Sequence, residues 1–268
     1  LEHQPLRIIL DSYLRVKVES KILQQNNVIV IYGIDQNSNL NVLIIGETII
    51  DNYITTEAVG KSGKEPVMVV KQKDQIKFLG GVGYIANLCA SFAKEVKMIS
   101  FLGEKSEEKK FVLKNLHKKV KHNFLLKKNS PTIIKTRYLD DYRKSKLLGV
   151  YDLNDDLISK KEENNFLNIL KTTIKKYDII IVADYGHGII TKEIRKIITN
   201  NSKKLFLNTQ INSFNRGYHT VYNYKKINSL IINESELRYE LKDKNSNVFN
   251  LAKKLKKKIS VENIIVTK

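Results

Sequence analysis

The alternation of short apolar strand segments with helical segments is the feature that most constrains the fold of this chain. Each expected strand is rich in β-branched residues, is bounded by turn residues and is apolar on both faces. Strands of this kind belong to a parallel sheet that is covered by helices on both sides, so the sequence predicts a doubly wound α/β fold. The expected strands are Val42–Ile45, Val96–Phe101, Ile179–Ala183, Leu205–Leu207, Leu230–Ile232 and Ile264–Val266, and the expected helices are Ile85–Ala93, Lys105–Leu116, Glu162–Lys175, Lys192–Thr199 and Val248–Lys257.

Two stretches, residues 54–78 and 131–152, interrupt this alternation. They contain the segments PVMVVKQKDQIKF and PTIIKTRYLDDYRKSKLLGVYDL, whose alternating pattern predicts antiparallel strands with one solvated face. Two such insertions favour a small β lid over a site, which would exclude water from a reacting phosphate. A pair of edge hairpins without a function explains the pattern equally well, so both interpretations stay open.

Residues 1–38 differ from the rest of the chain. They contain two strand-like runs on either side of a charged stretch, and the polar segment Asp35–Asn39 follows them as an expected linker. We therefore expect an N-terminal extension or fusion remnant at 1–38 and one α/β domain at 39–268. The length of 268 residues with 42% hydrophobic content is sufficient for one domain of this size.

The charge and the cysteine content limit the function classes. A formal net charge of +19 favours encounter with anions such as nucleic acid, acidic membranes or phosphorylated metabolites. The lysine pairs are scattered as on solvated helix faces, and no recognised nucleic-acid motif accompanies them, so we expect no nucleic-acid partner.

Cys89 is the only cysteine, which suits a reducing cytoplasm. No apolar run reaches transmembrane length and no signal peptide is visible, so we expect a cytoplasmic protein without a membrane partner.

Two glycine- and carboxylate-containing segments are candidates for binding a sugar. Asp51 follows the strand that ends at Gly46, where ligands bind in open α/β sheets, and its carboxylate could accept hydrogen bonds from two vicinal hydroxyls. Gly80 and Gly81 precede an expected helix, whose N-terminal N–H groups could hold a phosphate or hydroxyls. A helix or turn cap at Asp51 and a tight turn at the glycine pair are the simpler alternatives.

Two further candidates follow later strands. Asp184 ends a buried strand at the expected ligand edge, and Gly186 and Gly188 allow a tight turn beside it, whereas His187 is expected to be a plain loop residue. Asn233 and Glu236 begin a helix three residues apart and could organise a Mg²⁺–phosphate shell through water. Locally, a capping box of Asn233 and Glu236 is the better explanation.

Two apparent nucleotide motifs are rejected. The series Gly81, Gly83 and Ala86 imitates a dinucleotide fingerprint, but it follows a solvated lid strand and has no suitable acidic residue downstream. The segment Gly60–Ser62 resembles the end of a Walker A loop, but Thr55 occupies the position of the required earlier glycine.

The order of the segments GETIID, GGVGYIAN, PTIIKTRYL, VADYGHG and NESE resembles the ribokinase-like (PfkB) sugar kinases, closest to kinases of D-glycero-β-D-manno-heptose 7-phosphate. The resemblance covers residues 40–268. It implies phosphorylation of a sugar or sugar-phosphate hydroxyl with ATP and Mg²⁺ as cofactors, and a possible homodimer through the lid strands. The resemblance assigns substrate binding to Asp51, Gly80, Gly81, Tyr84, Lys135, Arg137 and Asp184, nucleotide binding to Asn208, Asn233 and Glu236, and the metal to Glu236.

Three departures from this family pattern bear on activity. Tyr84 stands where the family usually has an asparagine that contacts the sugar, and Asn208–Gln210 replaces an Asp-Pro-Lys sequence. The family's Gly-Ala-Gly-Asp segment, which supplies the anion hole and the catalytic base, would lie beyond Lys268. We therefore expect residues 1–268 alone to be nearly inert, with no catalytic residue among them. A non-catalytic sugar-phosphate-binding or scaffolding module derived from a kinase is the alternative.

The first 34 residues bear a separate resemblance. The segment PLRIILDSYLRVKVESKIL is similar to the opening strand and loop of riboflavin-biosynthesis reductases. It is too short to form such a domain, so we interpret it as a fusion remnant or an adventitious extension.

Overall fold

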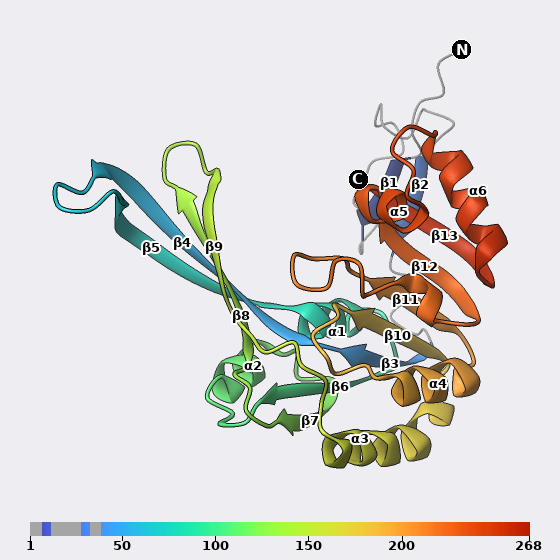
Figure 1. Cartoon of the computed structure of the whole chain (residues 1–268). Coiled ribbons are helices and arrows are strands. Elements are labelled where there is room, and N and C mark those ends of the chain that lie inside the picture. The colour runs from blue at the N-terminus through green and yellow to red at the C-terminus, as the bar shows by residue number, and fades with distance from the viewer. Residues whose placement is uncertain (1–6, 12–27, 33–38) are drawn as a thin grey trace.

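A seven-stranded parallel sheet forms the centre of the computed structural model, which describes residues 7–11, 28–32 and 39–268 (Figure 1). The strand order is β13-β12-β11-β10-β3-β6-β7, and every neighbouring pair is parallel. The strands are β3 (Asn41–Gly46), β6 (Glu95–Gly103), β7 (Val120–Lys127), β10 (Ile179–Asp184), β11 (Leu205–Thr209), β12 (Ile227–Asn233) and β13 (Val261–Thr267). The predicted doubly wound fold is confirmed.

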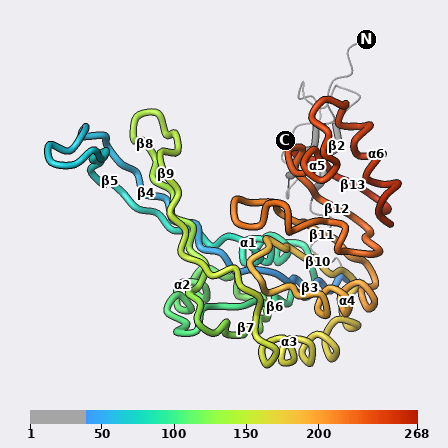
Figure 2. The backbone as a smooth tube through the Cα atoms, in the orientation of Figure 1, coloured from blue at the N-terminus to red at the C-terminus, as the bar shows by residue number. Residues whose placement is uncertain are grey.

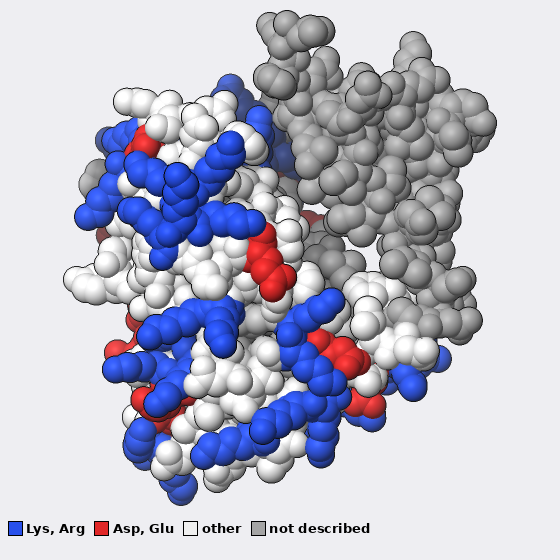
Figure 3. All heavy atoms as spheres, turned by 90° about the vertical axis from the view of Figure 1, so that its right-hand side faces the viewer, with Lys and Arg blue, Asp and Glu red and all other residues white. Residues whose placement is uncertain are grey.

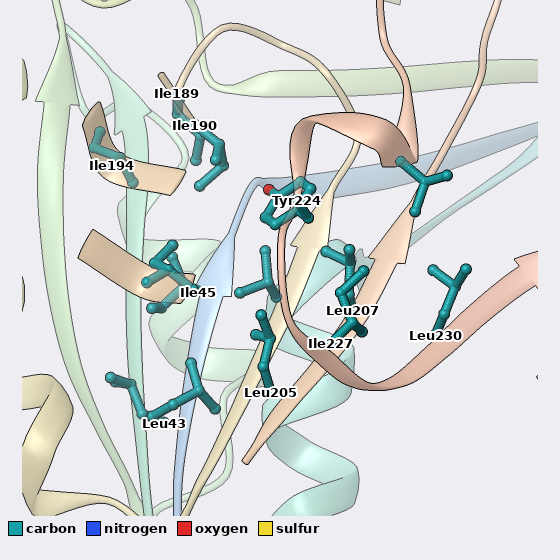
Figure 4. Close-up of a cluster of buried hydrophobic side chains, with 14 of the residues drawn as sticks. Leu43, Ile45, Ile189, Ile190, Ile194, Leu205, Leu207, Tyr224, Ile227 and Leu230 are labelled. Atoms are coloured by element: carbon teal, nitrogen blue, oxygen red, sulfur yellow. The ribbon is translucent and has the colours of Figure 1, made fainter. Parts of the chain in front are cut away.

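Helices cover both faces of this sheet because its strands are apolar on both sides. In β3, Leu43 and Ile45 belong to one buried cluster, and Val42 and Ile44 belong to another. The first cluster, part of which Figure 4 draws, includes side chains of α3 (Lys160–Thr173), α4 (Lys192–Asn201), α5 (Glu234–Leu241) and α6 (Val248–Lys258). The second includes side chains of α1 (Gly81–Cys89), and α2 (Lys109–Asn115) contributes Val112 to a third, smaller cluster.

Short helical turns and side-chain caps define where several helices begin and end. A 3-10 turn at Ile174–Lys176 follows α3, and a second 3-10 turn lies at Val221–Asn223. Ser159 and Glu162 form a capping box at the start of α3, which satisfies two backbone N–H groups that a helix N-terminus leaves free. Thr191 and Asn247 cap α4 and α6 through their side-chain oxygens.

A second, four-stranded sheet projects away from the body of the molecule (Figures 1 and 2). Its order is β5-β4-β8-β9, with β4 antiparallel to β5, β4 parallel to β8 and β8 antiparallel to β9. The strands are β4 (Thr48–Lys61), β5 (Met68–Gly80), β8 (Ile133–Asp140) and β9 (Lys146–Asp152). The two predicted insertions therefore form one sheet, which we call the lid sheet.

The strand order changes direction at β3. Along the chain, β6 and β7 are added on one side of β3, whereas β10 to β13 are added on the other. The carboxyl ends of β3 and β10 thus lie at a topological switch point, which is where ligands bind in open α/β sheets. The lid sheet begins at this same edge, since β4 starts at Thr48, two residues after β3 ends at Gly46.

The six expected strands lie inside observed strands, but three expected helices differ at their ends and one strand was missed. Helix α2 spans Lys109–Asn115 where Lys105–Leu116 was expected, α3 spans Lys160–Thr173 where Glu162–Lys175 was expected, and α1 ends at Cys89, not at Ala93. Helix α1 begins at Gly81, not at Ile85, because the backbone turns into the helix at the glycine pair. Strand β7 was not predicted, since its segment VKHNFLLK mixes polar and apolar residues as an edge strand does. At residues 1–38, the backbones of β1 (Arg7–Asp11) and β2 (Val28–Tyr32) pair in parallel, and the rest of this extension lies outside the described residues.

The surface charge is dispersed on the face that carries α6 and β13. Figure 3 shows that lysine and arginine side chains are spread over this face with aspartate and glutamate among them, and do not form one stripe. Within the described residues, no helix is both long and apolar enough to cross a membrane.

Candidate functional site: a cleft between the lid sheet and the switch point

A cleft of about 700 Å³ opens where the lid sheet meets the carboxyl ends of β3 and β10. Its wall combines the first part of β4, the end of β5, the first turns of α1 and the residue after β10. The lining residues are Asp51, Tyr53, Lys77, Phe78, Leu79, Gly80, Gly81, Tyr84, Ile85, Asn87, Asn115 and Tyr185. Four of the predicted substrate residues (Asp51, Gly80, Gly81 and Tyr84) thus lie together in one concave site.

Asp51 lies within strand β4, not in a loop after β3. Its Oδ1 atom accepts a hydrogen bond from Nη1 of Arg137, at 2.5 Å. The pair forms because β4 and β8 are parallel neighbours, with Asp51 opposite Lys135 and Tyr53 opposite Arg137. The predicted residues of the first motif and of the lid strand therefore meet across two adjacent strands.

Two cations and three tyrosines form a cluster beside the cleft. The Lys135 ammonium lies 5.8 Å from the ring centroid of Tyr151 and 5.7 Å from that of Tyr185. The Arg137 guanidinium lies 5.4 Å from the ring centroid of Tyr53 and 5.9 Å from that of Tyr151. Lys135 and Arg137 do not themselves line the cleft, but they contact residues that do. Distances below 6 Å are those of cation–π contacts.

Lys135 is unusual for a lysine because its side chain is almost entirely removed from water. It is 7% exposed, and within the described residues its ammonium makes no hydrogen bond. Burial lowers its pKa, whereas Glu47 and Asp51 act in the opposite direction. The side chain is largely buried, and its ammonium contacts aromatic rings without a hydrogen-bond acceptor in the described part of the chain, so this group is suited to pair with an anion that enters the cleft.

The glycine pair makes the junction between β5 and α1. Gly81 has φ +56°, and a Cβ atom there would collide with the carbonyl oxygen of Glu47. The N–H of Val82 donates to that same carbonyl at 3.0 Å. The helix can therefore begin directly at the cleft only if position 81 has no side chain. Tyr84, in the first turn of α1, is 57% exposed and lines the cleft.

Asp184 is not at the surface of the cleft. It is 2% exposed, its Oδ2 accepts from the Tyr224 hydroxyl at 2.7 Å, and its Oδ1 accepts from the Gly186 N–H at 3.1 Å. The next residue, Tyr185, lines the cleft in its place. Through these two hydrogen bonds, Asp184 stabilises the turn at 184–188. Within this turn, Gly186 has φ +71° and Gly188 has φ +83°.

Glu47 is a buried residue that the sequence did not single out as part of a site. It is 1% exposed, and its two carboxylate oxygens accept from the N–H groups of Tyr185 at 3.0 Å and His187 at 3.1 Å. Burial and the nearby Asp184 raise the pKa of Glu47 to about 8, partly offset by these two hydrogen bonds. The only signal in the sequence is its place directly after β3.

The predicted nucleotide residues lie at the carboxyl ends of β11 and β12. The Asn208 amide donates to the carbonyl of Ile231 at 2.9 Å. Asn233 and Glu236 form the capping box of α5, in which the Asn233 side chain accepts from Ser235 N–H and Glu236 accepts from Asn233 N–H at 2.9 Å. The capping explanation of this motif is confirmed.

The described residues do not form a direct metal site. Among them, no group of three or more His, Cys, Asp or Glu side chains is placed to hold an ion. The second oxygen of Glu236 accepts from the Ile211 N–H at 3.3 Å, so both oxygens already have backbone partners. Glu236 therefore fits a contact with Mg²⁺ through water better than direct coordination.

Comparisons with known proteins agree with this architecture. Two curated relatives are "Bifunctional protein HldE" of Aliarcobacter butzleri (28% identical over 234 residues, 85% of this chain and 48% of that protein) and of Nitratiruptor sp. (29% over 238 residues, 84% and 47%). The chain thus spans about half the length of these relatives.

Solved structures show the same fold at low sequence identity. Phosphofructokinase-2 from Escherichia coli in complex with fructose-6-phosphate superposes with a TM-score of 0.62 at 12% identity, over 85% of this chain and 73% of that chain. Arabidopsis thaliana ribokinase complexed with ribose and ATP superposes with a TM-score of 0.56 at 14% identity, over 85% and 72%. The model of the pfkB family carbohydrate kinases matches residues 39–268, so this chain belongs to the pfkB family of carbohydrate kinases.

Proposed function

We propose that the domain at 39–268 binds a sugar phosphate similar to heptose 7-phosphate in the cleft and belongs to an enzyme that phosphorylates it with ATP. Lys135 carries the proposal: its side chain is 7% exposed, and its ammonium lies beside the cleft without a hydrogen-bond acceptor among the described residues. An unphosphorylated sugar would leave this charge unpaired, whereas a phosphate would pair with it.

The remaining cleft residues are assigned roles that suit a polyhydroxylated ligand. Asp51 has acceptor capacity beyond its bond to Arg137, so it would accept hydrogen bonds from sugar hydroxyls. Backbone N–H groups at the start of α1 would bind a hydroxyl or phosphate oxygen, because the first N–H groups of a helix have no partner within it. Closure of the lid sheet would exclude water from the reacting groups.

The proposed nucleotide region is the edge formed by β11 and β12, with Asn208, Asn233 and Glu236. ATP bound there would be the phosphate donor, and Mg²⁺ held through water beside Glu236 would neutralise phosphate charge. In-line transfer depends on positioning and on an anion hole. Residues 1–268 do not contain a Gly-Ala-Gly-Asp segment, so we propose that they bind substrate with little or no turnover. A cytoplasmic location remains a prediction.

Binding and turnover test the proposal separately. Heptose 7-phosphate and unphosphorylated heptose should be titrated calorimetrically into residues 1–268 and into Lys135→Met. Lys135→Met should weaken the binding of heptose 7-phosphate by roughly 10- to 100-fold, because hydrogen bonds to charged groups contribute about 1.5–3 kcal/mol. It should leave the weaker binding of unphosphorylated heptose unaltered. Lys121→Met, at an exposed position of β7, is the matched control. Equal loss for both ligands would contradict a phosphate role for Lys135.

A non-catalytic sugar-phosphate-binding module is the second candidate. Tyr84, which occupies part of the cleft, and the uncharged Asn208–Gln210 segment favour it. ADP release with Mg²⁺–ATP and heptose 7-phosphate, measured for residues 1–268 and for the natural-length protein, separates the two. Turnover by the longer protein alone supports the kinase, and binding without turnover by either protein supports the module.

A further inference from the structure

The turn at 184–188, which presents Tyr185 to the cleft, is held by hydrogen bonds from two directions. On one side, the Glu47 carboxylate accepts from Tyr185 N–H and His187 N–H. On the other side, the Tyr185 carbonyl accepts from the amide groups of Asn212 at 2.8 Å and Asn215 at 3.0 Å. The backbone on both sides of the Tyr185 side chain is therefore fixed by side chains from two other segments.

Glu47 also connects this turn to the start of α1. Its carbonyl accepts from Val82 N–H, and the close approach of Gly81 to that carbonyl leaves no space for a side chain. One buried residue thus contacts two segments that both contribute to the cleft wall. A shift of Glu47 would move both.

His187 lies beside Glu47 and has an unsatisfied ring. The side chain is 1% exposed, and neither Nδ1 nor Nε2 has a hydrogen-bond partner among the described residues. Burial, together with the positive charges of Lys135, Lys127 and His219, lowers its pKa to about 3. The ring is therefore neutral, with one N–H donor and one nitrogen acceptor, and leaving both unpaired in the interior is unfavourable.

A small cavity adjoins this ring. Its volume is about 20 Å³, and its wall includes Glu47, Lys127, Thr132, Asn154 and His187. A single water molecule requires roughly 10–15 Å³ of such space and two to four polar partners. The Lys127 ammonium already donates to the carbonyls of Asn154 at 2.6 Å and His187 at 3.0 Å, which leaves it one further N–H.

We propose that this cavity binds one water molecule, which completes the hydrogen bonding of the His187 ring, and that Glu47 and the hydrated His187 position Tyr185 at the cleft. Water fits better than a cation because the Lys127 ammonium lies in the wall. It fits better than a polyatomic anion because the space of about 20 Å³ has room for a single water molecule. The positioning role rests on the proposed function, whereas the water site does not depend on it.

A crystal structure of residues 1–268 tests the water site directly. We expect a density peak within hydrogen-bonding distance of a His187 ring nitrogen and of at least one of Lys127, Thr132 and Glu47. His187→Phe fills a similar volume without ring nitrogens and should abolish the peak. A dry cavity in the unaltered protein, or a His187 ring bonded directly to protein groups, would overturn this part of the proposal.

NMR tests the same site in solution. In ¹⁵N-histidine-labelled protein, the signal that His187→Phe removes should be that of a neutral tautomer from pH 8 down to pH 5. Its ring N–H should show magnetisation transfer from water. A His187 ring that becomes protonated at about pH 6 would show that the cavity is open to solvent and would contradict the proposal.

Glu47→Gln tests the positioning role, with Glu262→Gln as a matched control at an exposed residue of β13. Glu47→Gln replaces one acceptor oxygen by a donor, so the amide ¹H signals of Tyr185 and His187 should shift upfield. The dissociation constant of heptose 7-phosphate should rise about tenfold, the effect expected when a buried donor loses its acceptor. Unchanged amide signals and affinity in a folded Glu47→Gln protein would overturn the role.

These measurements distinguish failure of this inference from failure of the proposed function. If the unaltered chain does not bind heptose 7-phosphate, the proposed function fails. The crystal structure would then still show whether the cavity binds water. The amide signals would still show whether Glu47 is hydrogen-bonded to the turn at 184–188.

Discussion

Arg137 and Asp51 form an ion pair across two neighbouring strands of the lid sheet, with 2.5 Å between Nη1 and Oδ1. Their side chains are 19% and 26% exposed, so the pair is partly shielded from water at the edge of the cleft. The guanidinium also lies against the rings of Tyr53 and Tyr151. This pair therefore links strands β4 and β8 of the lid sheet at the edge of the cleft.

A double-mutant cycle with Asp51→Asn and Arg137→Met should give a coupling energy of about 1 kcal/mol in urea unfolding, because the two groups are in direct contact. The exposed pair of Asp141 and Lys144, at 48% and 67%, should give less than about 0.5 kcal/mol. Equal coupling energies for the two pairs would mean that partial shielding from water does not strengthen the ion pair of Arg137 and Asp51.

The free energy of unfolding should depend on the protonation of Glu47. Its pKa is raised from the ordinary 4.5 to about 8 in the folded protein, so the unfolded state loses this proton first. Stability is consequently lost as pH rises from about 4.5 through about 8, with a slope of at most about 1.4 kcal/mol per pH unit for one proton. The charged groups that act on this region are Asp184 of β10, Lys135 of β8 and Lys127 of β7.

Thermal unfolding between pH 4.5 and pH 9 measures this dependence. In Glu47→Gln the slope should flatten, because the titrating group is absent, while Glu262→Gln should keep the slope of the unaltered protein. A slope that persists in Glu47→Gln would assign it to another group.

Removal of Phe166 should strongly destabilise the main core. This residue of α3 is fully buried, and its ring meets that of Phe101 edge to face with centroids 5.3 Å apart. Phe166→Ala should lower the free energy of unfolding by about 3–5 kcal/mol, because it leaves a cavity between α3 and the sheet. Phe249→Ala, at a ring that is 65% exposed, should cost less than about 1 kcal/mol. Similar losses at both positions would contradict the described packing of α3.

The lid sheet should mediate dimerisation. It carries exposed apolar side chains, including Val59 at 67% and Met68 at 73%, and exposed apolar patches on a sheet favour association. Sedimentation velocity should show a dimer that Met68→Lys and Val59→Lys convert to monomer, whereas Leu157→Lys, at an exposed residue outside the lid sheet, should not. A monomer at every concentration would rule out the dimer.

Local pattern was sufficient for six of the seven strands of the central sheet, all except the edge strand β7. The segments Val42–Ile45 and Ile179–Ala183 are uniformly apolar, and such strands are stable only when helices cover both faces, so the doubly wound fold followed from the residues themselves. The order of the motifs along the chain was sufficient to identify the pfkB family of carbohydrate kinases. The solvated pattern of residues 54–78 and 131–152 predicted strands, but not that they would form one sheet.

The sites that depend on long-range contacts were decided only by the tertiary structure. The sequence determined that Asp184 follows a buried strand, but only folding brought Tyr224 and the turn at 184–188 around its carboxylate and turned Tyr185 toward the cleft. Glu47 stands 138 residues from Tyr185 in the chain, so no local spacing indicates their hydrogen bond. Periodicity determines which face of an element is buried, whereas the partner of a buried polar group depends on which distant segment the fold places beside it.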